Sequence, residues 1–497
     1  MVYSRHRPEH LILKVIRVAT EKALMHARVN KAQGARIEFY NKTGKIHPRT
    51  TAGRYNTLRW SMVWITQIIF YGLCWLEWGG QQAVLFDIEE RKFHLFGLVL
   101  WPQDAMLLAV MLIVAATGLF FATALAGRVF CGFACPQTVY TAIFRWVETR
   151  VEGDHLARMR LDQSPPGLRK FAIKATKHVI WLSIALWTAI TFVGYFTPIR
   201  DLLARLPAEL GPWEGFWVFF YAAFTYLLAG FAREMVCMHM CPYSRFQGVM
   251  GDPDTRNVSY DVLRGEPRGA LSRRQPERAH QGDCVDCGVC VQVCPTGIDI
   301  REGLQYACIN CGLCIDACDE VMTRVGAPKG LIRFATEREL SAPKATPRPT
   351  LLRPRVQVYL ATLVLFAVTG VWMLIERTPL AVDILRDRHA LMRLDDAGRI
   401  ENDYILKVAN MLEQPRRFRV QVEGPADIRL ESSDTFEAAA GSITSLSVSV
   451  SGAADSSLRG SQQIRFTIHD LEAPETRVVE KTSFLLPVTL AGAVRQD

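Results

Sequence analysis

Two cysteine pairs of the same spacing stand at the edges of apolar stretches of the chain. The first pair, Cys131 and Cys135, lies in CGFACP, and the second, Cys237 and Cys241, lies in CMHMCP. An arginine shortly precedes each Cys-x3-Cys-Pro motif, so the two form an internal repeat. Thiols four residues apart share one face of a helix, and we expect each pair to present two sulfur atoms in one direction. The proline after each second cysteine predicts a break in the helix.

Four such thiols suit three kinds of chemistry: binding of one soft metal ion, ligation of a further iron–sulfur centre, or formation of two disulfides. Thiolate and thioether sulfur favour Cu(I) over hard cations, and Met240 adds a thioether beside Met238 and His239. The alternative is plain packing, because free cysteines are among the residues most often buried. The matched pairs favour a redox or metal role, and the candidate copper ligands are Cys131, Cys135, Cys237, Cys241 and Met240.

Two longer cysteine runs give a stronger signal. CVDCGVCVQVCP starts at Cys284 and CINCGLCIDAC starts at Cys308, and both have the Cys-x2-Cys-x2-Cys-x3-Cys spacing of bacterial two-cluster ferredoxins. In that arrangement the fourth cysteine of each run binds the cluster of the other run. The spacing therefore predicts two [4Fe–4S] clusters, one held by Cys284, Cys287, Cys290 and Cys318 and the other by Cys308, Cys311, Cys314 and Cys294. Zinc fits less well, since zinc sites usually pair two Cys-x2-Cys units across a longer loop.

Other cofactor classes have no support in the sequence. The eleven histidines fall outside the apolar stretches or at their edges, so a haem ligated inside a helical bundle is not expected. The sequence contains no Cys-x-x-Cys-His haem-attachment motif, no GxGxxG motif and no Walker phosphate loop. Electrons must therefore arrive from another protein or from a quinol.

The elements that position these cysteines are predicted to be transmembrane helices. A helix needs about 20 mostly apolar residues to cross a bilayer. Five stretches of the chain approach that length, namely 60–78, 105–126, 179–196, 216–231 and 356–375.

The distribution of Lys and Arg predicts the orientation of these helices. Basic residues are abundant before residue 60 and in 127–178, and they are scarce in 79–104 and 197–213. The positive-inside rule therefore places the N-terminus and 232–355 in the cytoplasm and the C-terminal part outside. The net charge of +9 is explained by the basic cytoplasmic segments, so no nucleic-acid partner is expected.

After the last apolar stretch the sequence alternates between apolar and polar residues. RFRVQVEG, ADIRLES, ITSLSVSVSG and QQIRFTIHD follow this pattern and are separated by Gly, Asp and Ser. Several short strands of this kind predict a small β-sandwich. All thirteen cysteines precede residue 320, so this domain must be held together by its own core without disulfides.

The predicted fold class is an α-helical membrane bundle with a ferredoxin-like insertion and a C-terminal all-β domain. Its parts are a basic cytoplasmic segment (1–59), four transmembrane helices that carry both cysteine pairs (60–244), a cytoplasmic two-cluster ferredoxin-like domain (245–340), a linker with the fifth transmembrane helix (341–376) and the external β-domain (377–497).

Several longer segments match one known family. They include KIHPRTTAGRYNTLRW from Lys45, RVFCGFACPQTVYTAIFRWVE from Arg128, REMVCMHMCPYSRFQGVM from Arg233 and GDCVDCGVCVQVCPTGIDIREGLQYACINCGLCIDACD from Gly282. Over most of residues 45 to 335 the chain resembles the CcoG family of cytochrome c oxidase accessory proteins, also called FixG or RdxA. The C-terminal part is similar in character to the Ig-like periplasmic domain of that family, with NDYILKVAN from Asn402 as the best local match.

The resemblance implies a multi-pass protein of the bacterial inner membrane that assists assembly of cbb3-type cytochrome oxidase. The implied activity is reduction of Cu(II) to Cu(I), which would make the protein a cupric reductase. The eight cluster cysteines and the four cysteines of the Cys-x3-Cys-Pro pairs occupy family positions, whereas Met238 and His239 are not fixed parts of the pattern. The implied partners are the lipid bilayer, oxidase assembly factors or a copper transporter or chaperone, and an electron donor. The sequence is compatible with an oligomer.

Two other functions are weighed against this one. A related class of membrane ferredoxins, similar to NapH, shares the Cys-x3-Cys-Pro pairs but passes quinol electrons to a partner without copper. A non-redox assembly scaffold is the third hypothesis, and the triple cysteine runs argue against it. The resemblance alone favours copper reduction over the quinol-linked function.

Overall fold

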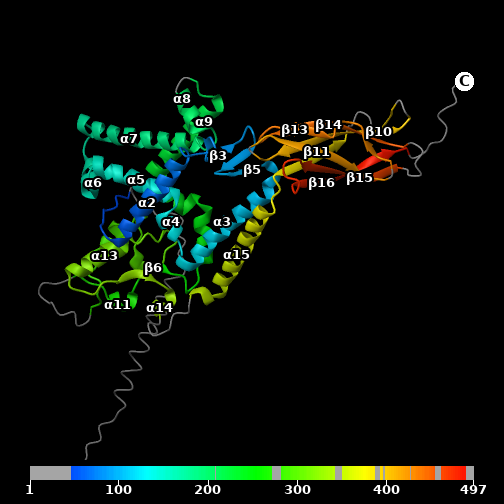
Figure 1. The fold of residues 1–497 in the computed structure, drawn as a ribbon. Coiled ribbons are helices and arrows are strands. Elements are labelled where there is room, and N and C mark those ends of the chain that lie inside the picture. The colour runs from blue at the N-terminus through cyan, green and yellow to red at the C-terminus, as the bar shows by residue number, and fades with distance from the viewer. Residues whose placement is uncertain are drawn as a thin grey trace, which may run out of the picture. The chain divides into compact units, whose positions relative to one another are not determined.

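The computed structural model describes residues 46–206, 209–270, 281–341, 350–386, 392–395, 398–412, 414–425, 427–453 and 460–487. Within these ranges the chain forms two compact units (Figure 1). One contains the residues up to Glu90, 94–97 and 111–367, and the other contains 91–93, 98–110 and 368–497. Most of the basic segment 1–59 lies outside the described residues.

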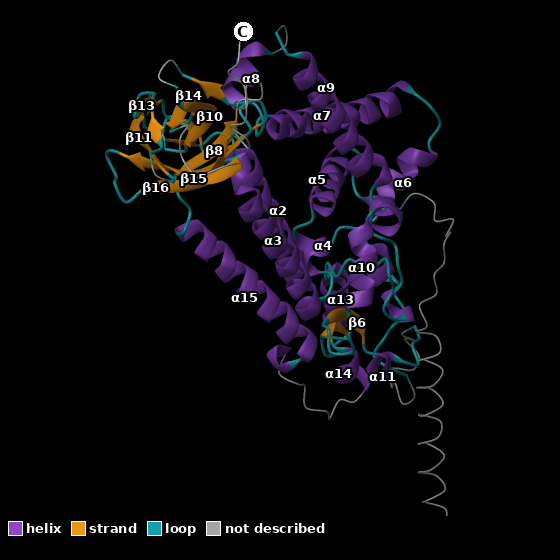
Figure 2. Ribbon diagram, turned by 90° about the vertical axis from the view of Figure 1, so that its right-hand side faces the viewer, coloured by secondary structure: helices purple, strands orange, loops and turns teal. Residues whose placement is uncertain are grey.

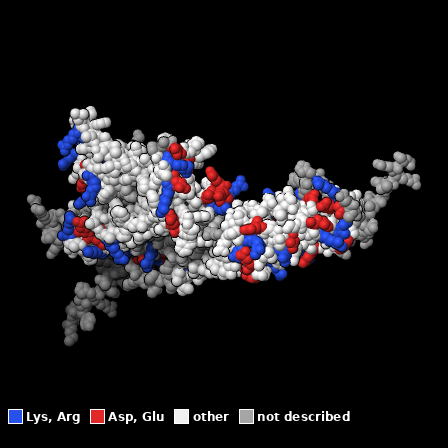
Figure 3. Space-filling model, turned by 45° about the horizontal axis from the view of Figure 1, so that its top comes forward, with Lys and Arg blue, Asp and Glu red and all other residues white. Residues whose placement is uncertain are grey.

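Four helices are long and apolar enough to cross a membrane, within the described ranges. They are α3 with the short helix before it (Pro102–Ala126), α7 (Leu168–Val193), α9 (Pro212–Leu227) continued by the π-helix η2 (Leu228–Ala232), and α15 (Pro354–Ile375). Large apolar side chains such as Leu182, Phe219 and Leu365 stand exposed on them, as lipid-facing residues do. Figure 3 shows that charged residues are sparse on much of the face formed by this helical part.

The first predicted span differs from the structure. It was expected over 60–78, whereas α2 covers Arg54–Leu73 and is followed by a short antiparallel pair of strands, β1 (Glu77–Trp78) and β2 (Gln81–Gln82). Polar residues such as Thr57, Arg59 and Gln67 keep α2 below the apolarity of the other four helices. The structure thus contains four of the five predicted spans as strongly apolar helices, and α2 is a less apolar fifth helix.

Shorter elements connect these helices. They are β3 (Val84–Asp87), β4 (Lys92–Leu95), β5 (Leu98–Leu100), η1 (Pro102–Asp104), α4 (Val129–Phe133), α5 (Pro136–Val151), α6 (His155–Gln163), α8 (Ile199–Arg205), the π-helix η3 (Val236–Met240) and η5 (Thr350–Leu352). Two of them, α4 and η3, carry the first cysteine of each Cys-x3-Cys-Pro pair.

The cysteine-rich insertion folds around one small antiparallel pair of strands. β6 (Asn257–Tyr260) pairs with β7 (Ile332–Ala335), so the two ends of the insertion meet. Between and around them lie α10 (Pro242–Met250), α11 (Val262–Gly265), α12 (Val289–Gln292), η4 (Ile300–Glu302), α13 (Leu313–Arg324) and α14 (Glu337–Ser341). Val258, Ile300, Ile315 and Met322 form its buried core together with several cysteines.

The C-terminal residues form the predicted β-sandwich (Figure 2). One sheet has the order β12 (Arg429–Leu430), β14 (Ile443–Gly452), β10 (Ile400–Asn410) and β8 (Leu380–Arg386), and β9 (Arg393–Leu394) also pairs with β10. The other has the order β13 (Thr435–Ala438), β11 (Arg416–Glu423), β15 (Gly460–Asp470) and β16 (Arg477–Leu486). Tyr404, Phe418, Phe466 and Phe484 fill the core, and burial alternates along the strands.

Candidate iron–sulfur and thiol site

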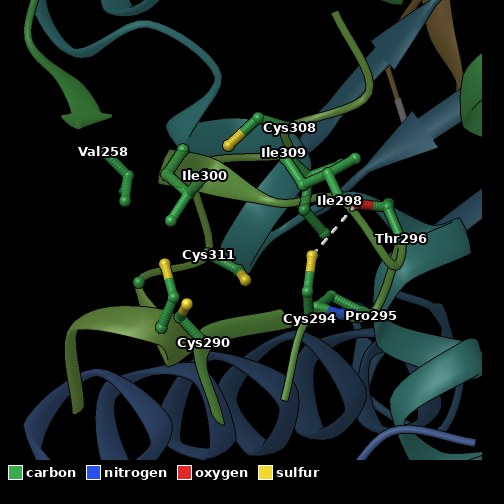
Figure 4. Close-up of a pocket in the computed structure, with 12 residues that line it drawn as sticks. Val258, Cys290, Cys294, Pro295, Thr296, Ile298, Ile300, Cys308, Ile309 and Cys311 are labelled. Carbon is green, nitrogen blue, oxygen red and sulfur yellow. Dashed lines mark hydrogen bonds between the residues drawn. The ribbon is translucent and has the colours of Figure 1, made fainter. Parts of the chain in front are cut away.

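The eight clustered cysteines line two small cavities. The first cavity is bordered by Cys284, Cys287, Cys290 and Cys318. The second cavity is lined by Cys294, Cys308, Cys311 and Cys314, and Cys290 lines it as well as the first (Figure 4). Cys294 lines the cavity of the second run and Cys318 that of the first, as the spacing predicts, while Cys290 lines both, so the assignment of ligands to each cluster stays a prediction.

The same backbone turn folds both runs. Asp286 and Asn310, each directly before a cysteine, have positive φ angles of 53° and 54°. Gly288 and Gly312 follow with φ of 66° and 75° and are the N-caps that directly precede α12 and α13. Two left-handed residues within three positions curl the chain tightly, and glycine adopts this conformation without strain. The turn therefore brings the first three cysteines of each run around one cavity.

The lining of the cavities fits iron–sulfur clusters. Besides thiols, the second cavity is lined by apolar side chains such as Val258, Ile300 and Ile309, and Figure 4 shows cysteine sulfur atoms around its interior. Burial raises the pKa of the Cys308 thiol to about 12 and that of Cys290 to about 11, so metal is needed to hold them as thiolates at neutral pH. No three His, Cys, Asp or Glu side chains of the described residues converge on a point as ligands of one metal ion do.

A buried arginine beside the second cavity supports the same interpretation. Arg59 on α2 is 7% exposed, and its Nε has no hydrogen-bond partner. It interacts electrostatically with Cys311 and Cys294. A buried guanidinium requires a negative counterpart, and thiolates that hold a cluster supply one. The sequence contained no local signal for this residue, because its cysteine neighbours lie more than 200 positions away.

The two Cys-x3-Cys-Pro pairs have equivalent local structures. Cys131 lies in α4 and Cys237 in η3, while Cys135 and Cys241 have extended backbones directly before Pro136 and Pro242, which begin α5 and α10. The predicted helix break is therefore present. The expectation that both cysteines of a pair share one helix face is wrong, because a residue before proline is forced out of the helical conformation.

The four cysteines of these pairs, here called the rim thiols, lie near one another. Cys131 interacts electrostatically with Cys135, Cys237 and Cys241. Burial first, and the neighbouring thiols second, raise the pKa of Cys131 to about 12 and that of Cys237 to about 11. Met240, the remaining candidate copper ligand, is 60% exposed. The structure thus brings the two repeats together at one place.

The rim thiols adjoin the second cavity. Cys131 packs in one cluster with Val293, Ile309 and Cys311. Gly132 permits this approach, since a Cβ at that position would lie 2.7 Å from the carbonyl oxygen of Ile309 and 3.0 Å from the Cα of Cys311. A larger residue would push the two segments apart.

Hydrogen bonds also stabilise the contact between the rim-thiol segments and the cysteine-rich insertion. Arg128 donates hydrogen bonds to the carbonyl oxygens of Ser244, at 2.7 Å, and of Tyr306, and its guanidinium lies over the Tyr306 ring. Ser244 in turn donates to the carbonyl oxygen of Cys237 at 2.7 Å and bonds the Tyr306 hydroxyl. One arginine therefore links the first repeat, the second repeat and the chain just before Cys308.

A buried ion network holds the second repeat. Arg233, with a positive φ of 43°, donates to both carboxylate oxygens of Glu148, at 2.6 and 3.3 Å. Glu148 also pairs with Arg158 at 3.1 Å. Burial alone raises the pKa of Glu148, but Arg233, Arg158 and Lys177 outweigh it and hold that pKa below its usual value. These buried charges thus fix the segment that carries Cys237. Their pairing was not predicted from the sequence.

Curated proteins similar to this chain cover most of its length. Protein RdxB of Cereibacter sphaeroides is 39% identical over 407 residues, which are 79% of this chain and 84% of RdxB. The nitrogen fixation protein FixG of Rhizobium meliloti is 35% identical over 441 residues, 82% of this chain and 84% of FixG. The chain belongs to the FixG/RdxA/RdxB family. This confirms the resemblance stated from the sequence.

Three family models match separate segments of this FixG-family chain. A 4Fe-4S dicluster domain matches residues 232–337, a 4Fe-4S binding domain matches 108–152, and the Ig-like fold at the C-terminus of FixG matches 370–487. The methylamine utilization ferredoxin-type protein MauN of Paracoccus denitrificans is 25% identical over 39% of this chain and 56% of MauN. A crystal structure of a FixG-related protein from Vibrio parahaemolyticus covers 22% of this chain and 98% of that one, with 25% identity and a TM-score of 0.21. The chain is therefore a FixG-type iron–sulfur electron-transfer protein with apolar membrane helices and an Ig-like domain.

Proposed function

We propose that this protein carries electrons through two [4Fe–4S] clusters to the rim thiols, where Cu(II) is reduced to Cu(I) for assembly of a cbb3-type cytochrome oxidase. The observation that carries the proposal is the contact of Cys131 with the lining of the second cavity through Ile309 and Cys311. A thiol pair that adjoins a cavity lined by cluster-type cysteines is suited to receive electrons from a cluster bound there.

The ligands follow from the cavities. Cys284, Cys287, Cys290 and Cys318 would hold one cluster, and Cys294, Cys308, Cys311 and Cys314 the other. Each cluster, when bound, supplies one-electron redox chemistry. Val258, Ile300 and Ile309 give the second cavity an apolar lining, and Cys287, which lines the first cavity, is exposed to solvent.

The rim thiols would bind copper in both oxidation states and favour the reduced one. Cu(II) takes up one electron to become Cu(I), and no proton is consumed by that change. Sulfur ligands prefer Cu(I), so binding by a pair of thiols drawn from Cys131, Cys135, Cys237 and Cys241 would stabilise the product. Arg128 and Ser244 keep the thiols in position through their bonds to the backbone. An exposed Met240 is available to copper from solvent.

Contacts at both ends of α2 support a fifth membrane crossing. At its start, the backbone amides of Tyr55 and Asn56 donate to Asp316 of the cysteine-rich insertion. Near its end, Tyr71 bonds Thr188 at 2.8 Å and the carbonyl oxygen of Phe70 accepts from Tyr195 at 2.7 Å, both close to the far end of α7. A helix that reaches from the insertion to the far end of a membrane span would cross the same layer.

With this fifth crossing, the proposed topology is a multi-pass protein of the inner membrane with the insertion in the cytoplasm and the Ig-like domain in the periplasm, as the distribution of Lys and Arg predicts. The proposed partners are an electron donor in the cytoplasm, and oxidase assembly factors or a copper transporter or chaperone.

A second candidate function is favoured by one observation. The family model of a 4Fe-4S binding domain covers 108–152, which contains Cys131 and Cys135. The rim thiols would then hold a further iron–sulfur centre that passes quinol electrons to a partner, without copper.

Rim-thiol variants separate the two functions. In the anaerobically reduced Cys131→Ser and Cys241→Ser proteins, the EPR signals of both clusters should persist, while the rate of loss of the Cu(II) EPR signal should fall at least tenfold. Cys74→Ser is the control, since Cys74 is a buried lone cysteine near the end of α2. Wild-type rates of Cu(II) loss in both rim variants would contradict copper reduction at these thiols. Loss of a third iron–sulfur signal would favour the quinol-linked function.

A further inference from the structure

The charge of Arg59 is uncompensated in the part of the chain that the structure describes. Its side chain is almost completely buried, its Nε lacks a partner, and no carboxylate is among the charged groups that act on it. The described groups that attract it are the thiols of Cys311 and Cys294, both in the lining of the second cavity. A guanidinium stays charged in proteins, so the positive charge cannot be removed by deprotonation.

The position of Arg59 is fixed by the docking of α2 on the insertion. Tyr55, one helical turn earlier on the same face, packs against Gly312 at the start of α13. The amides of Tyr55 and Asn56 are held by the Asp316 carboxylate, at 3.2 and 2.7 Å. Figure 4 shows α2, in dark blue, running past the second cavity. Arg59 is therefore held beside the cavity by a rigid helix.

The arginine at the first cavity is in a different situation. Arg301, which lines that cavity, donates to Asp299 from Nε at 2.8 Å and from a terminal nitrogen at 2.7 Å. It also pairs with Asp286. Two carboxylates thus neutralise the charge of Arg301 at the first cavity. The charge of Arg59 at the second cavity has no such partner among the described residues, so it acts on the group that the thiols bind.

We propose that Arg59 raises the reduction potential of the cluster in the second cavity above that of the cluster in the first. This inference rests on the proposed clusters. Uptake of one electron adds negative charge, and a nearby buried positive charge favours that uptake. One electron moves from the first cluster to the second, the first is oxidised and the second reduced, and no bond or proton changes. The electron therefore resides preferentially in the second cavity, beside Cys131.

A redox titration followed by EPR tests this on the full-length protein, with dithionite as reductant and no copper present. Arg59→Gln should lower the potential of the second cluster alone. The equilibrium constant for electron transfer from the first to the second cluster should fall at least tenfold, which is about 59 mV for one electron. Arg59→Lys keeps the charge and should stay close to the wild type.

Arg333→Gln is the matched control, because Arg333 lies in the same insertion but pairs with Asp261. It should leave the difference between the two potentials unchanged. An unchanged difference in Arg59→Gln would overturn the proposal, and so would an equal shift in Arg333→Gln. If the Arg59→Gln protein does not retain the second cluster, the Arg59→Lys protein provides the test. Loss of the second cluster in Arg59→Lys, or a lowered potential of that cluster, also contradicts the proposal. None of these results depends on copper, so they leave the copper-reduction proposal to its own test.

Discussion

Gly132 lies against the backbone of Cys311, and a Cβ on Gly132 would come within 3.0 Å of the Cys311 Cα. Gly132 belongs to the first Cys-x3-Cys-Pro motif and Cys311 to the second ferredoxin-type run. The contact joins the segment that carries the first pair of rim thiols to the lining of the second cavity. The two segments meet through backbone atoms, with no side chain between them. In the proposed function, electron transfer between these two places would depend on such close packing.

Replacing Gly132 by valine should disrupt this junction. Its Cβ would overlap the Ile309 carbonyl oxygen at 2.7 Å, and backbone atoms cannot move aside as a flexible side chain does. We expect slower reoxidation of the reduced clusters by Cu(II), together with weaker retention of the second cluster, measured by stopped-flow absorbance and iron analysis. Gly72→Ala is the control, because no atom lies within 4 Å of a Cβ there. Wild-type kinetics in Gly132→Val would show that the contact is dispensable.

Replacing the fourth cysteine of each run by serine tests the ligand sets. Cys318 lies in the second run but borders the first cavity, and Cys294 shows the reverse arrangement. Cys318→Ser should therefore remove the same EPR signal as Cys287→Ser, and Cys294→Ser the same signal as Cys308→Ser. Each variant should retain about four irons per chain, one cluster of the [4Fe–4S] type. If Cys318→Ser instead removes the EPR signal that Cys308→Ser removes, each cluster is bound by the four cysteines of a single run.

Asp316 should stabilise the docking of α2. Its carboxylate accepts from two amides in the first turn of α2, which has no side-chain cap of its own. Loss of a helix cap costs about 0.5–2 kcal/mol, so Asp316→Ala should lower the temperature at which the visible absorbance of the clusters is lost. Asp316→Asn keeps one acceptor oxygen and should lie between the alanine variant and the wild type. Equal stability of all three proteins would exclude a capping role.

Glu148 should make stability depend on pH. Its pKa in the folded protein is below the usual value, so its ionised form contributes stability above the unfolded-state pKa of about 4.3, and this is lost as the pH falls through the folded value. Removing one partner of a buried ion pair costs about 3–5 kcal/mol. Glu148→Gln should therefore be less stable at neutral pH, and the difference from the wild type should shrink below about pH 5.

Thermal unfolding followed by tryptophan fluorescence measures this effect, since Trp181 lies near Arg233 in the same network. The control is Glu320→Gln, which removes one partner of an exposed pair with Arg324. Exposed pairs contribute about 0–1 kcal/mol, so this variant should follow the wild type at every pH. A difference between Glu148→Gln and the wild type that is independent of pH would contradict the expected titration.

Local patterns in the sequence predicted much of this structure. Alternation located the strands that became β11, β14 and β15, and cysteine spacing predicted which cysteines line each cavity. Both signals are local, because strand periodicity and tight turns are set by neighbouring residues.

Features that depend on tertiary packing could not be predicted. The partners of Arg59, Glu148 and Arg128 lie many positions away, so their roles required the fold. The shared helix face expected for Cys131 and Cys135 was overridden by Pro136, although the proline itself was visible in the sequence. The helix that begins at Arg54 was placed too late, since apolarity alone marks it poorly.

Iron analysis combined with EPR of the anaerobically purified, dithionite-reduced protein tests the two-cluster assignment most directly. Two clusters of four irons predict about eight irons per chain and two interacting [4Fe–4S] signals. About four irons per chain, or zinc bound by the cysteines of either cavity, would contradict it.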